Sequence, residues 1–218
     1  MLYRKKTIIL VGGGGHCKVI IDAIKKSRKF IIYGVIDKNL AKGTSILGSK
    51  VIGRDNMLPM IFKQGIKNAF ISVGSTGNCG IRKKICDNLK NIGFKLPIIT
   101  HPNSVIAEDV KFGEGTFVAA GAVINPGVKI GKNVIINTSS SVDHDCEIAD
   151  FVHIAPGVTL SGNVKIGSQT HIGTGTKIIQ GLSIGKNCMV KAGELVRRDV
   201  PDNITYSDRI YEEYLKRE

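Results

Sequence analysis

The chain has 218 residues, with 31 Lys and Arg against 18 Asp and Glu, which gives a formal net charge of +13. Hydrophobic residues make up 42% of the chain and charged residues 22%, a globular composition that excludes a disordered chain. No apolar run approaches the roughly 20 residues of a membrane span. The apolar stretch 7–11 behind the basic N-terminus is too short for a signal peptide.

The excess positive charge has two interpretations, a polyanionic partner or a surface solvated by lysines. The lysines form no long runs and are not interleaved with aromatic residues, so we expect no nucleic acid partner, whereas a small phosphorylated ligand stays open. The cysteines are five in number, scattered, and without a Cys-x-x-Cys pair. This pattern predicts a reducing, cytoplasmic location, with neither a disulfide framework nor a metal site.

The first hundred residues predict a small Rossmann-like βαβ domain with a parallel sheet. Strands are expected over 7–11, 30–36 and 69–73. One helix is expected to end near Ser27, and a second, with Ile81, Ile85 and Leu89 on one face, is expected to stop at Gly93.

A glycine-rich turn, Gly12–Gly15, follows the first predicted strand. A dinucleotide fingerprint would need a third glycine where Cys17 stands, although Asp37 lies 23 residues after Gly14, near the place of a ribose-binding acid. A hundred residues also supply only half of a Rossmann fold. The fingerprint is therefore a weak indication of a dinucleotide.

We expect the backbone of this turn, including Gly13 and Gly14, to hold a phosphate or a sugar at the start of the following helix. The alternative is a purely structural turn. Gly74 belongs to a second glycine-rich loop, 74–78, after the third predicted strand. Because both loops leave the same sheet edge, Gly74 is expected to form the other wall of one pocket.

A six-residue repeat occupies the second half of the chain. Every sixth position from 106 to 196 is Ile, Val, Leu or Phe. These positions are Ile106, Phe112, Val118, Ile124, Ile130, Ile136, Val142, Ile148, Ile154, Leu160, Ile166, Ile172, Ile178, Ile184, Val190 and Val196. A second series, four residues after each of these, is small or apolar until Glu194, which predicts that the regular core ends near there.

A period of six is neither helical nor that of a simple strand. It predicts short strands separated by turns, three strands to a coil of eighteen residues, with coils stacked at about the 4.8 Å strand spacing. The domains are therefore predicted as residues 1–100, residues 101–200 and a C-terminal tail, residues 201–218. In the tail, Ser207 or Asp208 could cap a short helix.

One polar stretch carries candidate chemistry. His144 lies two residues after an inward position and is expected to point out of the coil. Asp145 can hold one imidazole nitrogen and leave the other as a base, provided that His144 lies near a corner. Gly162, eighteen residues later, is expected to lie over His144 and to offer a backbone N–H to an oxyanion. His153 and His171 are also eighteen apart and are expected to stack.

The hexads resemble the hexapeptide-repeat acyltransferases, which fold as a left-handed parallel β-helix. Three segments bring the resemblance closer: Val-Asp-His-Asp-Cys (142–146), Phe-Val-His-Ile-Ala-Pro-Gly (151–157) and Gly-Asn-Val-Lys-Ile-Gly (162–167). With the glycine loop and the domain order, they are similar to bacterial sugar acetyltransferases of the PglD/NeuD type. That family includes N-acetyltransferases of nucleotide-linked 4-amino sugars and sialic acid O-acetyltransferases.

The resemblance implies acetyl-CoA as co-substrate, no metal, and a homotrimer with active sites between subunits. It implies an N-terminal domain that binds the nucleotide-sugar. His144 would be the general base and Asp145 its partner, with His16 and Asn137 on the sugar and Asp37 on the nucleotide.

The resemblance also implies residues for acetyl-CoA. His153 and the Gly162 N–H would lie near the thioester, and Thr174 and Gly193 would line the CoA groove. The family usually ends with a Gly-x-Pro-Ala-Lys segment near CoA, which this chain lacks. The residues toward the end of the groove are therefore a weaker inference than the base.

Three functions are compared on this basis. The first is transfer of acetyl from acetyl-CoA to the 4-amino group of a nucleotide-linked deoxysugar, for surface glycan or polysaccharide assembly. The second is O-acetylation of sialic acid or another sugar by the same base. The third is a non-enzymatic scaffold with a nucleotide-sensing domain, against which the intact pair of His144 and Asp145 argues.

Overall fold

The computed structural model describes residues 6–207. The chain folds as two compact units. Among the described residues, 6–75 and 79–102 form the first unit, and 76–78 together with 103–207 form the second. The division after Pro102 falls close to the predicted domain boundary at residue 100.

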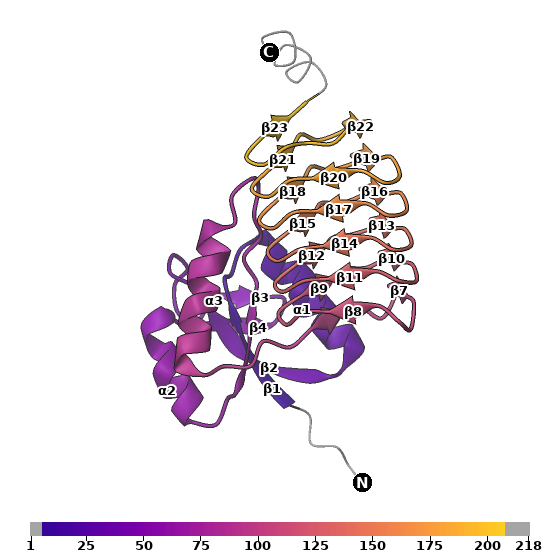
Figure 1. Cartoon of the computed structure of the whole chain (residues 1–218). Coiled ribbons are helices and arrows are strands. Elements are labelled where there is room, and N and C mark those ends of the chain that lie inside the picture. Colours follow the sequence, from indigo (N-terminus) through magenta and orange to yellow (C-terminus); the bar gives the residue numbers. More distant parts are fainter. Residues whose placement is uncertain (1–5, 208–218) are drawn as a thin grey trace. The chain divides into compact units, whose positions relative to one another are not determined.

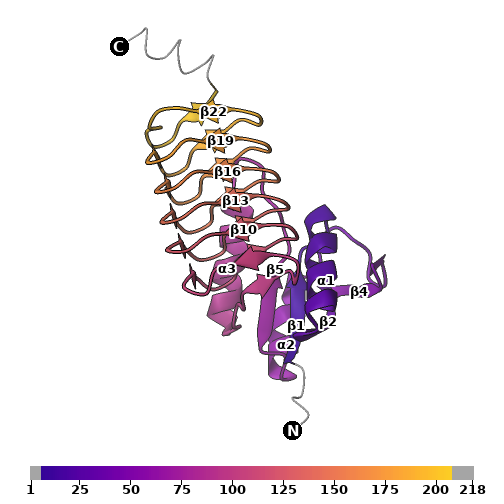
Figure 2. The same ribbon diagram turned by 90° about the vertical axis from the view of Figure 1, so that its right-hand side faces the viewer.

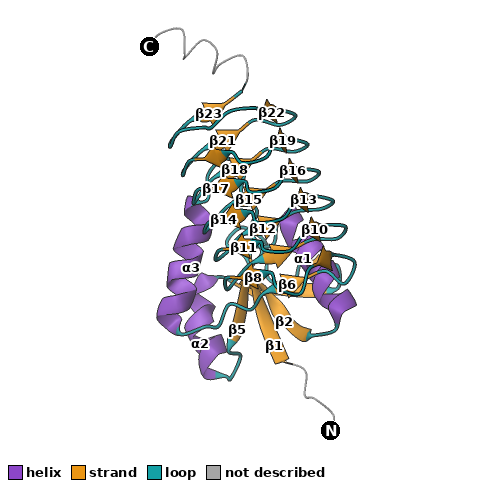
Figure 3. Ribbon diagram, turned by 45° about the vertical axis from the view of Figure 1, so that its right-hand side comes forward, coloured by secondary structure: helices purple, strands orange, loops and turns teal. Residues whose placement is uncertain are grey.

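The first unit is an α/β domain built on a mainly parallel sheet. Its strands are β1 (Lys6–Val11), β2 (Phe30–Ile36), β3 (Ser45–Ile46), β4 (Ser49–Gly53) and β5 (Asn68–Ile71), in the order β3-β4-β2-β1-β5. Only the β3–β4 pair is antiparallel. Helix α1 (Gly15–Ser27) lies on one side of the sheet, and α2 (Leu58–Lys63) and α3 (Gly80–Ile92) lie on the other (Figure 3). A 3-10 turn, η1 (Asp55–Met57), precedes α2, and β6 (Ile99–Thr100) lies near the end of the unit.

The predicted elements of this unit are confirmed. Ile8–Leu10 are fully buried, as a run of apolar residues in a central parallel strand requires. Helix α3 ends at Gly93, whose φ of 103° lets its N–H reach the carbonyls of Leu89 and Lys90. Ile81, predicted on the buried face of this helix, is instead 57% exposed. That exposure matters for the pocket described below.

The second unit is a left-handed parallel β-helix of two-residue strands (Figure 1). One column of strands, seen face-on in Figure 2, contains β7 (Val105–Ile106), β10 (Val123–Ile124), β13 (Ser141–Val142), β16 (Thr159–Leu160), β19 (Lys177–Ile178) and β22 (Leu195–Val196). The next contains β8 (Lys111–Phe112), β11 (Lys129–Ile130), β14 (Glu147–Ile148), β17 (Lys165–Ile166) and β20 (Ser183–Ile184). The third contains β9 (Phe117–Val118), β12 (Ile135–Ile136), β15 (His153–Ile154), β18 (His171–Ile172), β21 (Met189–Val190) and β23 (Thr205–Tyr206).

The six-residue repeat forms the interior of this unit. The second residue of each strand points inward, and from Val118 to Val196 these side chains are at most 3% exposed. Partners within a column pair in parallel at eighteen-residue intervals, as Ile130 pairs with Ile148. Polar members of the second series are buried too, but each hydroxyl is hydrogen-bonded; Thr116, for example, donates to the Gly131 carbonyl at 2.8 Å.

The prediction that the regular core ends near Glu194 is wrong. Strand β22 continues the first column, and β23 extends the third into the segment expected as a tail. Val196, Val200 and Tyr206 fill the interior there and are at most 2% exposed. The helix expected beyond Ser207 lies outside the described residues.

We predict that inward and outward residues of one strand differ sharply in their contribution to stability. Leu160→Ala should lower the free energy of unfolding by about 2–5 kcal/mol, because it leaves a cavity in the core. Thr159→Ala, on the exposed side of the same strand, should change it by about 0.5 kcal/mol or less. Urea unfolding at one protein concentration measures both, and equal losses would contradict the inward assignment.

Candidate active site

The turn between β13 and β14 carries the predicted base. Asp143 opens this turn, and its Oδ1 accepts the His144 N–H at 2.8 Å and the Asn125 side-chain amide at 2.8 Å. Asn125 lies one coil earlier, so two successive coils hold the backbone beside His144. These two donors, Asn125 first, lower the pKa of the Asp143 carboxyl and keep it an acceptor.

His144 and Asp145 form the predicted pair. His144 Nδ1 lies 2.9 Å from Asp145 Oδ2. Adjacent side chains of a strand diverge, but Asp145 has a left-handed φ of 59°, which turns its carboxylate back toward the imidazole. Because a carboxylate only accepts, neutral His144 carries its proton on Nδ1 and leaves Nε2 as the basic nitrogen. The hydrogen bond to Asp145 is the main cause that raises the pKa of His144.

The imidazole lies across Gly162, as the eighteen-residue spacing predicts. A methyl group at Gly162 would come within 2.5 Å of His144 Nε2. His144, Gly162, Asn163, Gln180 and Gly181 line a cavity of about 220 Å³ along this corner. Within residues 6–207, the Gly162 N–H donates to no other group, which leaves it available to a ligand.

A second polar group lies at the other end of β13. Asn137 follows β12, and its side-chain nitrogen lies 3.1 Å from His153 Nε2. The amide oxygen accepts the Thr138 N–H at 2.8 Å, so the nitrogen must be the end that faces His153. Neutral His153 therefore accepts at Nε2 and carries its proton on Nδ1.

His153 and His171 stack one coil apart, as predicted. Their ring centroids are 4.8 Å apart at an interplanar angle of 84°, and both side chains are buried. Burial lowers the pKa of His171, which favours the neutral form of its ring. Thr174 and Gly193 are exposed and lie on the turns after β18 and β21, at the same corner as Asn137.

The sequence-predicted residues of the β-helix thus form two groups in one chain. His144, Asp145 and Gly162 share one corner, and Asn137, His153, Thr174 and Gly193 follow another. The strand β13 separates the turns that carry His144 and Asn137. A single coil therefore does not bring the base and all predicted binding residues together.

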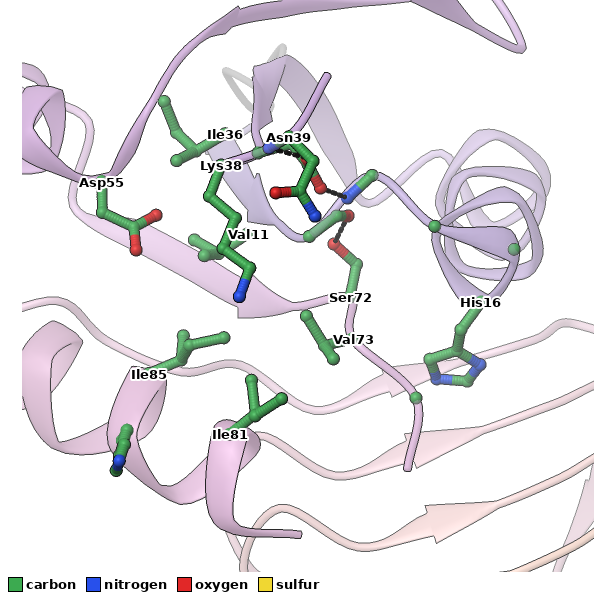
Figure 4. A pocket seen from close by; sticks show the side chains of 17 residues that line it. Val11, His16, Ile36, Lys38, Asn39, Asp55, Ser72, Val73, Ile81 and Ile85 are labelled. Atoms are coloured by element: carbon green, nitrogen blue, oxygen red, sulfur yellow. Dashed lines mark hydrogen bonds between the residues drawn. The ribbon is translucent and has the colours of Figure 1, made fainter. Parts of the chain in front are cut away.

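The first unit holds a pocket of about 670 Å³ at the carboxyl ends of β1, β2 and β5 (Figure 4). Gly13, Gly14, His16, Asp37 and Gly74 all line it, as expected for one ligand site. Side chains added at Gly14 and Gly15 would meet nothing within 4 Å, so the start of α1 is open to a ligand.

Asp37 braces the glycine turn. Its Oδ2 accepts the Gly13 N–H at 2.7 Å, and its Oδ1 accepts the N–H groups of Asn39 and Leu40 at 2.8 and 2.9 Å. Partial burial raises the pKa of this carboxyl, but the three donors outweigh burial and the pKa is lowered. Asp37 therefore shapes the pocket wall, and its contact with a nucleotide stays a prediction.

His16 is almost uncharged at any physiological pH. Burial, and then the positive charge of Arg82, lower its pKa to about 4. Arg82 is 3% exposed on α3, and its Nη1 lies 3.4 Å from the Ser75 hydroxyl. Sequence reasoning did not identify Arg82, because a charged residue in a helix gives no sign of burial by itself.

No metal site or membrane helix was found in the described part of the chain. Within residues 6–207, His, Cys, Asp and Glu side chains nowhere gather in a group of three that could hold a metal ion. No helix of that same stretch is long and apolar enough to cross a membrane.

Comparisons with known proteins place the chain in a family. The model of the PglD N-terminal domain matches residues 7–89, and the bacterial transferase hexapeptide (six repeats) matches residues 127–162. A variant of perosamine N-acetyltransferase from Caulobacter crescentus, solved with CoA and GDP-perosamine, is 34% identical with a TM-score of 0.85, covering 91% of this chain and 93% of that chain. This chain belongs to the PglD-type sugar acetyltransferases.

Two further structures resemble this PglD-type chain. The acetyltransferase domain of PglB from Neisseria gonorrhoeae, solved with acetyl coenzyme A, is 33% identical with a TM-score of 0.83, covering 91% of this chain and 94% of that chain. WeeI from Acinetobacter baumannii is 27% identical with a TM-score of 0.81, covering 94% and 98%. A search of curated protein sequences found no match.

We predict that two histidines of this PglD-type chain, His16 and His144, have widely different pKa values. By NMR, His144 should titrate above the ordinary value of about 6.5, and His16 should stay neutral until about pH 4. Asp145→Asn should lower the pKa of His144, because it removes the carboxylate that favours the imidazolium, and should leave His16 unchanged. A His144 pKa unaffected by Asp145→Asn would contradict the pairing.

Proposed function

We propose that this protein transfers acetyl from acetyl-CoA to the 4-amino group of a nucleotide-linked amino sugar. The observation that carries the proposal is the His144–Asp145 pair, with Nε2 directed over Gly162 in a chain of this family. Two of the relatives named above are solved with ligands, the perosamine N-acetyltransferase variant with CoA and GDP-perosamine and the PglB domain with acetyl coenzyme A. The pocket at the glycine turn suits a phosphorylated sugar nucleotide.

The proposed reaction uses His144 as the general base. The sugar amine attacks the acetyl carbonyl carbon and a C–N bond forms, while a proton passes from nitrogen to His144 Nε2. The Gly162 N–H stabilises the oxyanion. The C–S bond then breaks, and the CoA sulfur leaves with the proton returned by His144. Asp145 stabilises the imidazolium between these two steps.

We also propose a homotrimer in the cytoplasm. The separation of His144 from the Asn137 corner supports active sites between subunits, because a neighbouring chain can supply the group that one chain places elsewhere. The five cysteines are free and buried, which supports a reducing compartment.

Release of CoA thiol tests the activity. Acetyl-CoA is offered with UDP-, GDP- and dTDP-linked 4-amino sugars and, separately, with sialic acid. Thiol release with an amino sugar nucleotide is the expected result. Thiol release with sialic acid alone would replace the proposed reaction by O-acetylation. If none of the acceptors in the panel gave thiol release, the proposed reaction would be contradicted.

We predict that His144→Ala lowers kcat by about 10²–10⁴-fold, the usual contribution of a general base. KM for acetyl-CoA should change little, because the imidazole acts on the nucleophile. Asp145→Asn should cost less, since it disturbs only the orientation and basicity of the ring. With an amine acceptor, the residual activity of His144→Ala should rise with pH as more amine is unprotonated. Wild-type turnover by His144→Ala would show that this histidine is not the base.

We predict that two impaired variants complement each other. His144→Ala damages one corner and Asn137→Ala damages the other. When both chains are co-expressed, about a quarter of intersubunit sites in randomly mixed trimers receive an intact His144 from one chain and an intact Asn137 from its neighbour. Recovered thiol release and a trimeric mass by sedimentation check this. No recovery in mixed trimers would place both residues in a site within one chain.

A further inference from the structure

The pocket of the first unit differs between its two ends. Figure 4 shows Asp55 at one end, beside Ile36, and His16 on the far side of the glycine turn. Ile81 and Ile85 of α3 line the wall below Lys38. The pocket thus has a carboxylate next to an apolar section at one end and a neutral imidazole at the other.

The apolar section suits a flat aromatic ring. Ile81 is 57% exposed although it projects from α3 into the pocket lining. Burying such a side chain against a ligand removes apolar surface from water, which favours binding by roughly 25 cal/mol per Å². The face of a nucleobase is the part of a sugar nucleotide that could cover it.

The middle of the pocket suits the diphosphate. Gly14 and Gly15 leave the start of α1 open, and no side chain caps that helix. Lys38 and Lys84 add two positive charges to the lining. With the phosphates held there, a base at the Asp55 end would leave the sugar at the His16 end.

We propose that Asp55 recognises the base and selects guanine, so that the substrate is a GDP-linked sugar; this rests on the proposed function. A carboxylate only accepts hydrogen bonds. Guanine offers two adjacent donors, N1–H and the N2 amino group, which match the two carboxylate oxygens. Uracil and thymine present one N–H between two carbonyl oxygens, and these oxygens repel a carboxylate. Asp55 therefore discriminates against UDP- and dTDP-sugars both by attraction to guanine and by repulsion of the alternatives.

Calorimetric titration of the full chain with GDP, UDP and dTDP, without acetyl-CoA, tests this. We expect GDP to bind at least about tenfold more tightly than UDP or dTDP, as one bidentate contact to a base provides. Asp55→Asn should remove most of that preference, with GDP affinity falling about tenfold and UDP affinity unchanged or higher. Asp55 is exposed and Asn is nearly isosteric, so the variant should fold. Asp87→Asn, an exposed position of α3 outside the pocket, is the matched control and should change nothing.

Tighter binding of UDP or dTDP by the wild-type chain would overturn the guanine assignment, independently of any variant. An equal loss for all three nucleotides in Asp55→Asn would overturn it too, because it would show a role without base selection. Either of these results would leave the proposed acetyl transfer standing, because thiol release could still occur with another sugar nucleotide. Binding of none of the three nucleotides would remove both this inference and the nucleotide part of the proposed function.

Discussion

The eighteen-residue coil is the constraint on which the β-helix and its site depend. Because every coil has the same length, residues eighteen apart occupy equivalent places in successive layers about 4.8 Å apart. A side chain that points out of the β-helix at a corner then contacts the equivalent residue of the next layer. His144 meets a glycine, and that absence of a side chain gives the imidazole its place and leaves a backbone N–H uncovered. The same stacking puts Asn125 against Asp143 and His153 against His171.

The backbone conformation of one residue brings the imidazole of His144 and a carboxylate together as a hydrogen-bonded pair. Asp145 accepts a left-handed backbone at the corner, where several other turns of the β-helix place Asn or Gly. Asp tolerates that conformation better than most side chains. The residue that tolerates the left-handed backbone of the turn is therefore also the one that orients His144. An Asn here would suit the backbone equally but would lack the charge that favours the imidazolium.

Much of this site follows from the sequence, because a repeat fixes both the layer and the facing of each residue. The hexads alone placed Gly162 over His144 and paired His153 with His171, and the structure confirms both. Asn125 was missed although it lies eighteen residues before Asp143, so the same rule would have found it. The end of the core was misjudged at Glu194 because the β-helix accommodates this half-buried acid while the inward series continues.

Less of the first unit could be predicted from the sequence, since no repeat determines which of its residues are in contact. The burial of Arg82 and the place of Asp55 depend on how α3 and η1 pack around the sheet, and neither contact has a regular spacing. The short β3–β4 hairpin that leads to Asp55 was not predicted either. The sequence did indicate the glycine turn and Asp37, because so tight a turn restricts which residue types can occupy it.

The two histidines nearest the pockets show how differently two surroundings tune the same side chain. Exposed His144 keeps a carboxylate partner, and the hydrogen bond to that carboxylate raises the pKa of the imidazole. Half-buried His16 lies near Arg82, and its pKa of about 4 keeps it neutral near pH 7. A neutral imidazole both donates and accepts, which suits a sugar carrying hydroxyl groups. Under the proposed function, these environments would suit His144 to proton transfer and His16 to hydrogen bonding with a sugar.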